Sequence, residues 1–394
     1  MKYLGIDIGK EKHTASLISE SGEQLFKPFL FTNSAKGYAK LTQKLNKFKK
    51  DTIIIGMEAT GHYWLNLYEK LHADKYFITV LNPIQVKAFR NQGVRGSKTD
   101  LLDAELIAKV LRFGATIETK MPGDITLSLR NLTRYRSDLS EHMAKLKNKA
   151  ISLLDQIFPE FSRLFSKTFG TAALAILKEA STPDEIIELD DDKLLKIISQ
   201  ASQGRLGLKK TQQLKEAAKT SFGLKIASDS FAFQMKLMIS EINHLKDTLK
   251  TLDKEIEKYY TKLNVKLTTI PGIGVINAAA IIAEIGDVNK FQNKKGGATA
   301  LVAFAGMDPK LKESGKWYGK VKMSKRGNRY LRKAIYSSSF CCLKWDEYFR
   351  NIYDKQRGKG KAHTVAVNYV GTKMLHVVYR ILKDNRDYIP VQKD

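Results

Sequence analysis

Four carboxylates from three separate segments of the sequence could together hold metal ions. Asp100 and Asp103 stand three residues apart at the start of Leu101–Phe113, a segment whose pattern predicts a helix. Residues three apart share one face of a helix, with Cβ atoms about 5–6 Å apart, so both side chains can point into one site. Two like charges that close repel each other unless a cation lies between them. Asp7 and Glu58 stand far upstream in strand-like settings.

This set of ligands suits chemistry on a phosphodiester. Oxygen-only ligation favours Mg²⁺ or Mn²⁺ over zinc. Two such ions about 3.5–4 Å apart offset the charge of a phosphodiester and hold its attacking and leaving oxygens in line. The sequence therefore predicts a metal site at Asp7, Glu58, Asp100 and Asp103.

The composition points to a polyanionic partner. The chain has 394 residues, enough for two or three domains, and its 67 Lys and Arg against 41 Asp and Glu give a net charge of +26. Such an excess favours nucleic acid as the partner, with a generally basic protein as the alternative. No long apolar segment indicates a membrane role. No signal-peptide pattern is present, so we expect the cytoplasm. Cys341 and Cys342 are adjacent, which predicts two buried helix residues rather than a disulfide or zinc site.

The first part of the chain has the pattern of a mixed α/β domain. In chain order the expected elements are three strands, a helix, a strand, a helix and a strand: Tyr3–Ile8, Thr14–Ser19, Leu25–Phe31, Ala35–Phe48, Thr52–Met57, Tyr63–Leu71 and Tyr76–Leu81. With the helix at Leu101–Phe113, this order is that of the RNase H-like fold. There the first and fourth strands lie side by side, which would bring Asp7 and Glu58 to matching depths.

The stretch between Asn82 and Asp100 is polar and follows an Asn-Pro breaker. We expect a flexible loop that becomes ordered on a phosphate backbone, although a merely solvated loop fits equally well. Its basic residues are candidate nucleic-acid contacts: Lys87, Arg90, Arg95 and Lys98.

The middle of the chain is helical. One long helix is expected from Leu127 to Phe158, followed by a less regular helical region over 160–225. In that region three adjacent acids, Asp190 to Asp192, fit a solvated helix start better than a metal site. A second long helix has an apolar heptad seam over four heptads, formed by Met235, Met238, Ile242, Leu245, Leu249, Leu252, Ile256, Tyr259 and Leu263. The two helices could pair within the chain or build a dimer, and a seam this regular favours self-association.

The C-terminal part combines a glycine turn with a basic segment. Ile270-Pro271-Gly272-Ile273-Gly274 followed by a helix over Val275–Ile285 resembles a helix-hairpin-helix, in which N–H groups at Gly272 and Gly274 would contact a DNA phosphate. An ordinary glycine turn is the alternative. Residues 310–333 hold ten Lys and Arg interleaved with aromatic side chains, a mixture that suits phosphate contacts and stacking. The candidate contacts there are Lys316, Lys325, Arg326 and Arg329. Two closing helices are expected, Tyr330–Leu343 and Thr364–Leu382.

Several short motifs occur in an order that resembles a known family. They are Gly5-Ile6-Asp7-Ile8-Gly9, Met57-Glu58-Ala59-Thr60-Gly61, Lys98-Thr99-Asp100-Leu101-Leu102-Asp103-Ala104, Ile270-Pro271-Gly272-Ile273-Gly274, Ala305-Gly306-Met307-Asp308-Pro309, Ser314-Gly315 and Ser324-Lys325-Arg326-Gly327-Asn328. Each motif is weak alone, but the ordered set is specific. The chain resembles transposases of the insertion sequence one-ten family, also called DEDD transposases, which include Piv-type DNA invertases.

The resemblance implies an architecture and a mechanism. It implies a RuvC-like (RNase H-like) domain over 1–118, a helical coiled-coil region over 119–264 and a mostly helical C-terminal transposase domain over 265–394. Its four acids would be Asp7, Glu58, Asp100 and Asp103, binding Mg²⁺, and its serine nucleophile matches Ser314. The family acts as dimers and tetramers on donor and target DNA, guided by a structured (bridge) RNA from the element itself. We place the extra length of this chain in the helical region around 160–225.

Other interpretations of the motifs remain open. The segment 5–9 also resembles the first phosphate motif of actin-like sugar kinases, but their other motifs are not found. A junction-resolving nuclease would share the four acids without needing Ser314, and a non-catalytic nucleic-acid-binding protein would explain the charge without the acids. Ser324 is the rival serine, although its place before Lys325 fits a helix or turn cap better.

Overall fold

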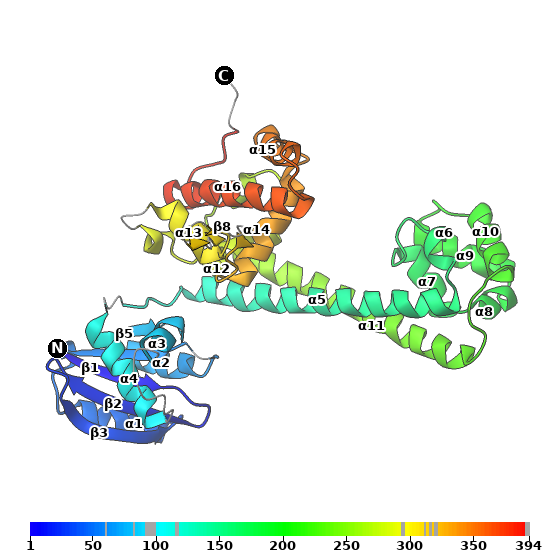
Figure 1. The fold of residues 1–394 in the computed structure, drawn as a ribbon. Coiled ribbons are helices and arrows are strands. Elements are labelled where there is room, and N and C mark those ends of the chain that lie inside the picture. The colour runs from blue at the N-terminus through cyan, green and yellow to red at the C-terminus, as the bar shows by residue number, and fades with distance from the viewer. Residues whose placement is uncertain are drawn as a thin grey trace. The chain divides into compact units, whose positions relative to one another are not determined.

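The structure, a computed structural model, has two compact units, Met1–Met121 and Pro122–Asp394 (Figure 1). It describes the whole chain except Thr60, Asn82, 91–99, 115–117, 293–295, 311–312, 315–316, 319–321 and 391–394. Within its helices and strands, the structure does not describe the side chains of Ile84, Gln85, Asp100, Lys310, 313–314 and 317–318.

The first unit is built on a five-stranded mixed sheet in the order β3-β2-β1-β4-β5. The strands are β1 (Lys2–Asp7), β2 (Lys12–Ser19), β3 (Gln24–Thr32), β4 (Ile53–Glu58) and β5 (Phe77–Leu81). The first three form an antiparallel meander, whereas β4 is parallel to β1 and β5 is parallel to β4. The expected meander and the expected adjacency of the first and fourth strands are both confirmed.

Helices cover both faces of this sheet. Successive side chains of a strand point to opposite faces, and two separate apolar clusters result. On one face Leu4 and Ile55 pack with side chains of α1 (Ala35–Leu45) and α2 (Trp64–Ala73). On the other face Ile54 packs with side chains of α3 (Pro83–Arg90) and α4 (Asp100–Phe113). A short 3-10 helix, η1 (Lys50–Thr52), precedes β4.

Gly5 sets how closely α4 approaches the sheet. A Cβ atom at Gly5 would lie 2.0 Å from the Ala104 carbonyl oxygen and 2.4 Å from the Ala108 backbone nitrogen. The neighbours are backbone atoms of a helix, so they cannot move aside individually. Glycine at this position therefore allows the helix backbone to rest directly on β1.

We expect Gly5→Ala to destabilise the first unit by about 1–3 kcal/mol, because α4 must shift to accommodate the methyl group. The measurement is chemical denaturation followed by a probe in the first unit. The matched control is Gly358→Ala, since nothing lies within 4 Å of a Cβ atom built there. Equal stabilities of the two variants would contradict the proposed packing role of Gly5.

The expected loop between Asn82 and Asp100 is wrong in its first half. Residues Pro83–Arg90 form helix α3, with Val86 buried. Proline is tolerated at the first position of a helix, where its missing N–H would have no helical partner. Residues 91–99 lie outside the described part of the chain.

The second unit is helical, and two long helices organise it. These are α5 (Asp124–Ile157) and α11 (Ser228–Tyr260), which pack side by side (Figure 1). The other helices are α6 (Phe161–Leu164), α7 (Thr171–Glu179), α8 (Pro183–Glu188), α9 (Asp191–Ser202), α10 (Leu208–Lys219), η2 (Leu267–Thr269), α12 (Val275–Ile285), η3 (Val288–Phe291), α13 (Gly297–Ala305), α14 (Arg329–Cys342), α15 (Glu347–Gly358) and α16 (His363–Asp384). Four two-residue strands precede α14: β6 (Pro309–Lys310), β7 (Glu313–Ser314), β8 (Trp317–Tyr318) and β9 (Lys322–Met323).

The heptad seam of the second long helix is used within the chain. Its side chains from Met235 to Ile256 are buried in two cores. One core joins the end of α5 and the start of α11 to α6–α10. The other joins the start of α5 and the end of α11 to α12–α16. The seam residues from Met235 to Ile256 are therefore already buried inside one chain, whereas Tyr259 and Leu263 are half-buried. Self-association stays a prediction.

Two further expectations concern local features. Asp190 accepts a hydrogen bond from the Lys193 N–H and begins α9, so the acidic triplet is a helix start as expected. Cys342 is buried but Cys341 is exposed, which corrects the expectation that both are buried. Adjacent helical residues point about 100° apart, and at this position of α14 Cys342 faces the core while Cys341 faces solvent. Among the described residues, no helix is long and apolar enough to cross a membrane.

Candidate active site

Asp7 and Glu58 lie on the same face of the sheet as helix α4. The paired residues of the parallel strands end at Ile6 and Met57, so Asp7 and Glu58 are the next residue on each strand. Asp7 is two residues beyond Gly5, whose vacant Cβ position contacts α4. Glu58 is likewise two residues beyond a glycine whose Cβ position contacts α4. Because the side-chain period of a strand is two, both carboxylates belong to the α4 face.

The direction of α4 brings its first turn toward the same edge. Near its end, the Arg112 Nε atom donates to the Glu20 carbonyl oxygen at 2.8 Å. Glu20 follows Ser19, which pairs with Lys2 at the start of β1. The last turn of α4 therefore lies near the start of β1. Its first turn, which carries Asp103, points toward the end of β1, where Asp7 lies.

Asp103 is buried and ion-paired. Its side chain is on the packed face of α4, and the residue is 8% exposed. The Arg90 Nη2 atom, at the end of α3, donates to the Asp103 Oδ1 atom at 2.9 Å. A buried carboxylate needs such a partner, because an uncompensated buried charge is costly. Arg90, expected as a nucleic-acid contact, thus has a partner within the chain.

The donor chemistry fits a divalent cation, although the full set of ligands is not described. Asp7, Glu58 and Asp103 supply oxygen atoms only, as Mg²⁺ prefers. Asp100 is the first residue of α4, one turn before Asp103, and its side chain lies outside the described atoms. No group of three or more His, Cys, Asp or Glu placed to hold a metal ion occurs among the side chains that the structure does describe. Asp7, Glu58 and Asp103 are among those side chains, so the structure does not bring these three together as a metal site.

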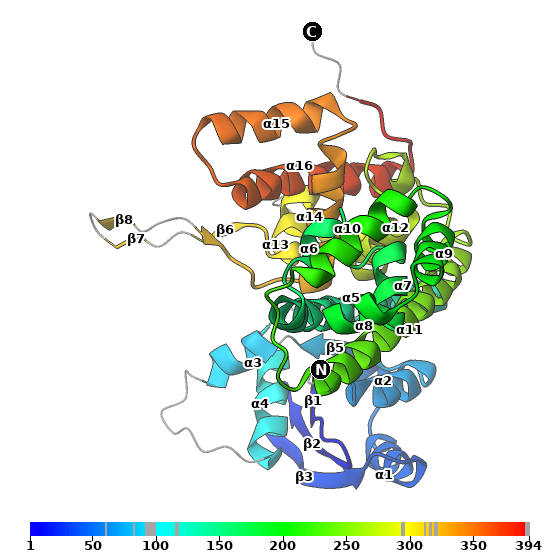
Figure 2. The same ribbon diagram turned by 90° about the vertical axis from the view of Figure 1, so that its right-hand side faces the viewer.

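Ser314 lies in a β-ribbon of the second unit. Pro309 pairs with Met323 in β6 and β9, and Ser314 pairs with Trp317 in a second two-stranded sheet, β7 and β8. Figure 2 shows β7 and β8 away from the helices of their unit. Two residues separate Ser314 from Trp317 in the sequence, so Ser314 stands next to the connection between two paired strands. A backbone at such a connection between strands can approach a bound molecule closely.

The base of this ribbon is fixed by two glycine-containing motifs. The Ser324 hydroxyl donates to Asp308 Oδ1 at 2.5 Å, and the Ser324 N–H donates to the Asp308 carbonyl at 2.9 Å. Gly306 and Gly327 approach so closely that a Cβ atom at Gly327 would lie 2.2 Å from the Gly306 nitrogen. Ser324 therefore caps the turn that anchors the ribbon, as its sequence context suggested.

A buried carboxylate, Glu284, contacts Asn328, which lies between this ribbon and helix α14. Glu284 in α12 is 2% exposed. Both of its oxygens accept hydrogen bonds from Arg134 of α5, at 2.6 and 2.8 Å. The Asn328 Nδ2 atom donates to Glu284 Oε2 at 2.6 Å, and the Asn328 Oδ1 atom caps the start of α14. The hydrogen bond to Glu284 raises the pKa of Arg134. Sequence reasoning missed this network.

Descriptions of one transposase family match both units of the chain. Residues 4–159 match the DEDD-type transposase description for IS110, and residues 264–354 match the description "Transposase IS116/IS110/IS902 family". The chain belongs to the IS110 family of transposases. Its enzymatic class, a DNA transposase or recombinase, agrees with the sequence-based expectation.

Relatives match along almost the whole chain. It is 23% identical over 392 residues to the "Insertion element IS110 uncharacterized 43.6 kDa protein" of Streptomyces coelicolor, covering 98% of this chain and 95% of that protein. It is 27% identical over 314 residues to the IS900 protein of Mycobacterium paratuberculosis, covering 77% and 75%. It is 23% identical to the "Pilin gene-inverting protein" of Moraxella bovis, covering 98% and 97%.

The candidate phosphate contacts of the transposase occupy different settings. Lys87, Lys325 and Arg326 are exposed. Arg329 is also exposed, and its Nη2 atom contacts the Tyr330 hydroxyl at 2.7 Å. Arg95, Lys98 and Lys316 lie outside the described residues.

The glycine turn before α12 differs from a helix-hairpin-helix. The three-residue η2 precedes the turn, where that motif has its first helix. Gly272 has φ +87°, and a Cβ atom there would lie 2.5 Å from the Cys342 nitrogen of α14. Gly272 therefore serves internal packing. Gly274 is exposed and begins α12, so its contact with phosphate stays a prediction.

Proposed function

We propose that this transposase cuts and rejoins DNA strands of an insertion sequence, with Ser314 as the nucleophile and an acidic Mg²⁺ site at Asp7, Glu58, Asp100 and Asp103. The observation that supports the proposal is the strand register together with the direction of α4, from which the backbone positions of Asp7, Glu58 and Asp103 belong to the same end and the same face of the sheet. The strand order supports an RNase H-like fold for this unit.

The acidic residues and Arg90 have separable roles. Bound Mg²⁺ would offset the charge on the scissile phosphate and orient its oxygens. The chain itself places Asp103 on a helix whose backbone lies directly against β1, a close approach that Gly5 allows because it has no Cβ atom. Arg90 compensates the charge of Asp103 when no other cation is present. These contacts keep the carboxylate in position before substrate binds.

A serine nucleophile explains how strands are rejoined without an external energy source. The Ser314 Oγ atom attacks the phosphorus, the bond from phosphorus to a deoxyribose oxygen breaks, and that oxygen leaves with a proton. The resulting phosphoserine ester retains the energy of the broken bond. The hydroxyl of another strand then attacks the phosphorus and releases Ser314. Serine needs activation for this step, which the basic segment around it can support by stabilising the alkoxide.

The partners follow from the family. We propose donor and target DNA as substrates, a structured guide (bridge) RNA that pairs with both, and a homodimer or tetramer as the active assembly. The name of the pilin gene-inverting relative refers to a DNA rearrangement, and the same exchange of strands serves inversion and transposition. The net charge of +26 supports the nucleic-acid partners.

The covalent step has a direct test. Incubated with its DNA, its RNA and Mg²⁺, the wild-type protein is expected to form a denaturant-resistant adduct through a phosphoserine at Ser314. Ser314→Ala is expected to bind nucleic acid but to form no adduct and exchange no strands. The readouts are gel mobility after denaturation and mass spectrometry of the modified peptide.

Ser324→Ala is the matched control. It removes one charge-assisted hydrogen bond at the base of the ribbon, so we expect slower exchange by roughly tenfold with the adduct still at Ser314. An adduct that survives in Ser314→Ala and disappears in Ser324→Ala would assign the nucleophile to Ser324. Unligated nicks with no adduct in the wild type would favour the junction-resolving nuclease instead.

A further inference from the structure

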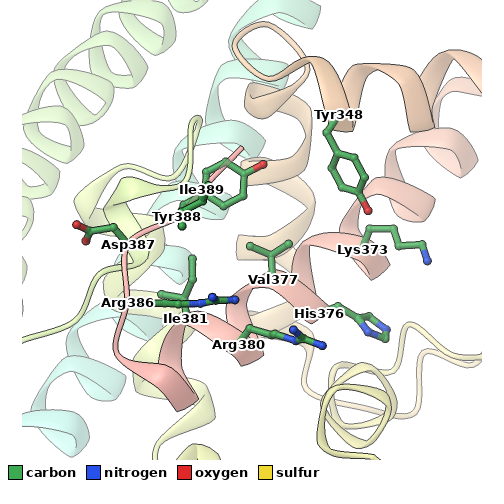
Figure 3. Close-up of a pocket in the computed structure, with 10 residues that line it drawn as sticks. All are labelled: Tyr348, Lys373, His376, Val377, Arg380, Ile381, Arg386, Asp387, Tyr388 and Ile389. Carbon is green, nitrogen blue, oxygen red and sulfur yellow. The ribbon is translucent and has the colours of Figure 1, made fainter. Parts of the chain in front are cut away.

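A pocket near the C-terminus combines aromatic, apolar and cationic side chains. It lies between α15, α16 and the segment after α16, and its volume is about 350 Å³. That volume is at the small end of ligand pockets, which run from about 300 to 1,000 Å³. The close-up in Figure 3 shows its lining, and we call it the C-terminal pocket. It is lined by Tyr348, Lys373, His376, Val377, Arg380, Ile381, Arg386, Asp387, Tyr388 and Ile389.

Its cations come mainly from one helical face. Lys373, His376 and Arg380 follow one another along α16 in steps of three and four residues, so they project from the same side. Arg386 follows the helix. In Figure 3 these four side chains point to one side of the view, whereas the Asp387 carboxylate points to the other. Lys373, Arg380 and Arg386 therefore present their positive charges to a common volume, beside the His376 ring, whose lowered pKa favours the uncharged form.

One acid compensates a cation of the pocket, because the Asp384 Oδ2 atom lies 3.5 Å from the Arg386 Nε atom. For the Lys373, His376 and Arg380 side chains, no ion pair or hydrogen bond is found within the described part of the chain. Asp387 lies 4.0 Å from the Lys266 Nζ atom, which compensates its charge. Burial, and then the neighbouring Lys373, lowers the pKa of His376. A bound anion would relieve the repulsion among these groups.

The aromatic wall is fixed by the core. The Tyr388 hydroxyl donates to Asp346 Oδ2 at 2.8 Å, and its N–H donates to Thr269 Oγ1 at 2.9 Å. The Tyr388 ring also stacks on Phe349, with centroids 6.3 Å apart. Asp346 in turn caps the start of α15. These contacts hold the segment after α16 in place, so the pocket is formed before any ligand binds.

We propose that the C-terminal pocket binds one nucleotide of a single-stranded nucleic acid. The base packs against Tyr348 and the apolar floor of Val377 and Ile381, and the phosphate binds between Lys373 and Arg380. Aromatic rings beside cations are the usual means of holding a single strand. A base inside a duplex is already stacked and paired, so it would have to leave the helix to enter. The proposal does not depend on the acids or on Ser314.

Site-specific photocrosslinking tests the proposal. The full-length protein is irradiated with oligouridylate containing 4-thiouridine, oligothymidylate containing 4-thiothymidine, or the corresponding duplexes, and crosslinked peptides are identified by mass spectrometry. We expect crosslinks at Tyr348 or Tyr388 with single strands. RNA alone, DNA alone or both would each support the proposal and identify the source of the nucleotide. Absence of crosslinks in these peptides, or equal crosslinking of duplexes, would overturn it.

Charge-matched variants separate this pocket from the general basic surface. Lys373→Gln with Arg380→Gln is expected to reduce the pocket crosslink about tenfold. Lys355→Gln with Lys359→Gln removes the same charge at exposed positions outside the pocket and is expected to change it less than about twofold. Equal effects of the two pairs would contradict a specific site.

The aromatic contact and the chemistry of Ser314 are tested separately. Tyr348→Ala is expected to lose most of the crosslink at Tyr388, whereas Tyr348→Phe keeps the ring and retains it. Loss in both variants would contradict stacking. In the Ser314→Ala background the pocket crosslink is expected to be unchanged, which distinguishes failure of this proposal from failure of the strand-exchange mechanism.

Discussion

Replacing Asp7, Glu58 or Asp103 by its amide is expected to abolish DNA strand cleavage, with a loss of at least about a thousandfold, or roughly 4 kcal/mol in activation free energy. Each amide is nearly the size of the carboxylate but lacks the charge that would hold Mg²⁺ in the proposed site at the end of β1 and β4. Nucleic-acid binding is expected to persist, because the basic residues are untouched. The measurement is cleavage of labelled DNA in Mg²⁺, with binding followed by anisotropy.

The control for this series is Glu69→Gln. Glu69 is an exposed acid on α2, the helix that covers the opposite face of the sheet. The substitution Glu69→Gln removes one negative charge from the same unit, and we expect DNA cleavage at the wild-type rate. Wild-type cleavage rates in any two of the three site variants would refute the assignment of the metal site.

The sheet of the first unit was predictable because strand patterns and short turns leave few arrangements. Alternation along the strands and the turns after Ile8 and Ser19 gave the meander, and the buried strand before Glu58 had its place beside β1. The glycines two residues before Asp7 and Glu58 are a signal of close packing on that face that the sequence analysis did not use. Helix α4, which covers these glycines, had no signal in the sequence beyond its periodicity.

The missed helix α3 shows how one residue can mislead a sequence analysis. Pro83 was interpreted as a breaker, yet proline at the first position of a helix starts it. Arg90 then looked like a free phosphate contact, whereas the end of α3 directs it to Asp103. A short polar helix has too little apolar periodicity to identify it, and Val86 alone was not enough.

The long helices illustrate a different limit. The heptad seam from Met235 to Ile256 correctly indicated a packed helix, but a seam does not specify its partner. Here α5 of the same chain and the helices of two cores cover it. The partner depends on the loops and on the 160–225 region, which returns the chain alongside α5.

Glu284 had a signal in the sequence that was not used. It is the single charged residue of Val275–Ile285, a helix whose other residues are apolar except Asn277. A carboxylate in such a helix must find partners when the helix is buried. Arg134 and Asn328 are those partners, but they lie 150 and 44 residues away in the sequence. Only the packing of α5, α12 and α14 reveals the connection.

Glu284→Gln is expected to destabilise the second unit by about 3–5 kcal/mol, because it leaves Arg134 and the nearby Arg130 without their buried countercharge. Arg130 is already poorly solvated, and burial lowers its pKa. Gln keeps a single acceptor oxygen, so it cannot accept from both the Arg134 guanidinium and the Asn328 side chain as the two Glu284 oxygens do, which loosens the start of α14 and the base of the ribbon that carries Ser314. Urea denaturation monitored in the second unit measures the loss.

The control is Glu255→Gln, which removes an exposed carboxylate 3.3 Å from Lys258 and is expected to cost less than about 1 kcal/mol. The double variant with Arg134→Gln is expected to lose less than the sum of the two single losses, since both partners of one interaction are removed. Additive losses, or equal stabilities of Glu284→Gln and Glu255→Gln, would show that the network does not hold these helices together.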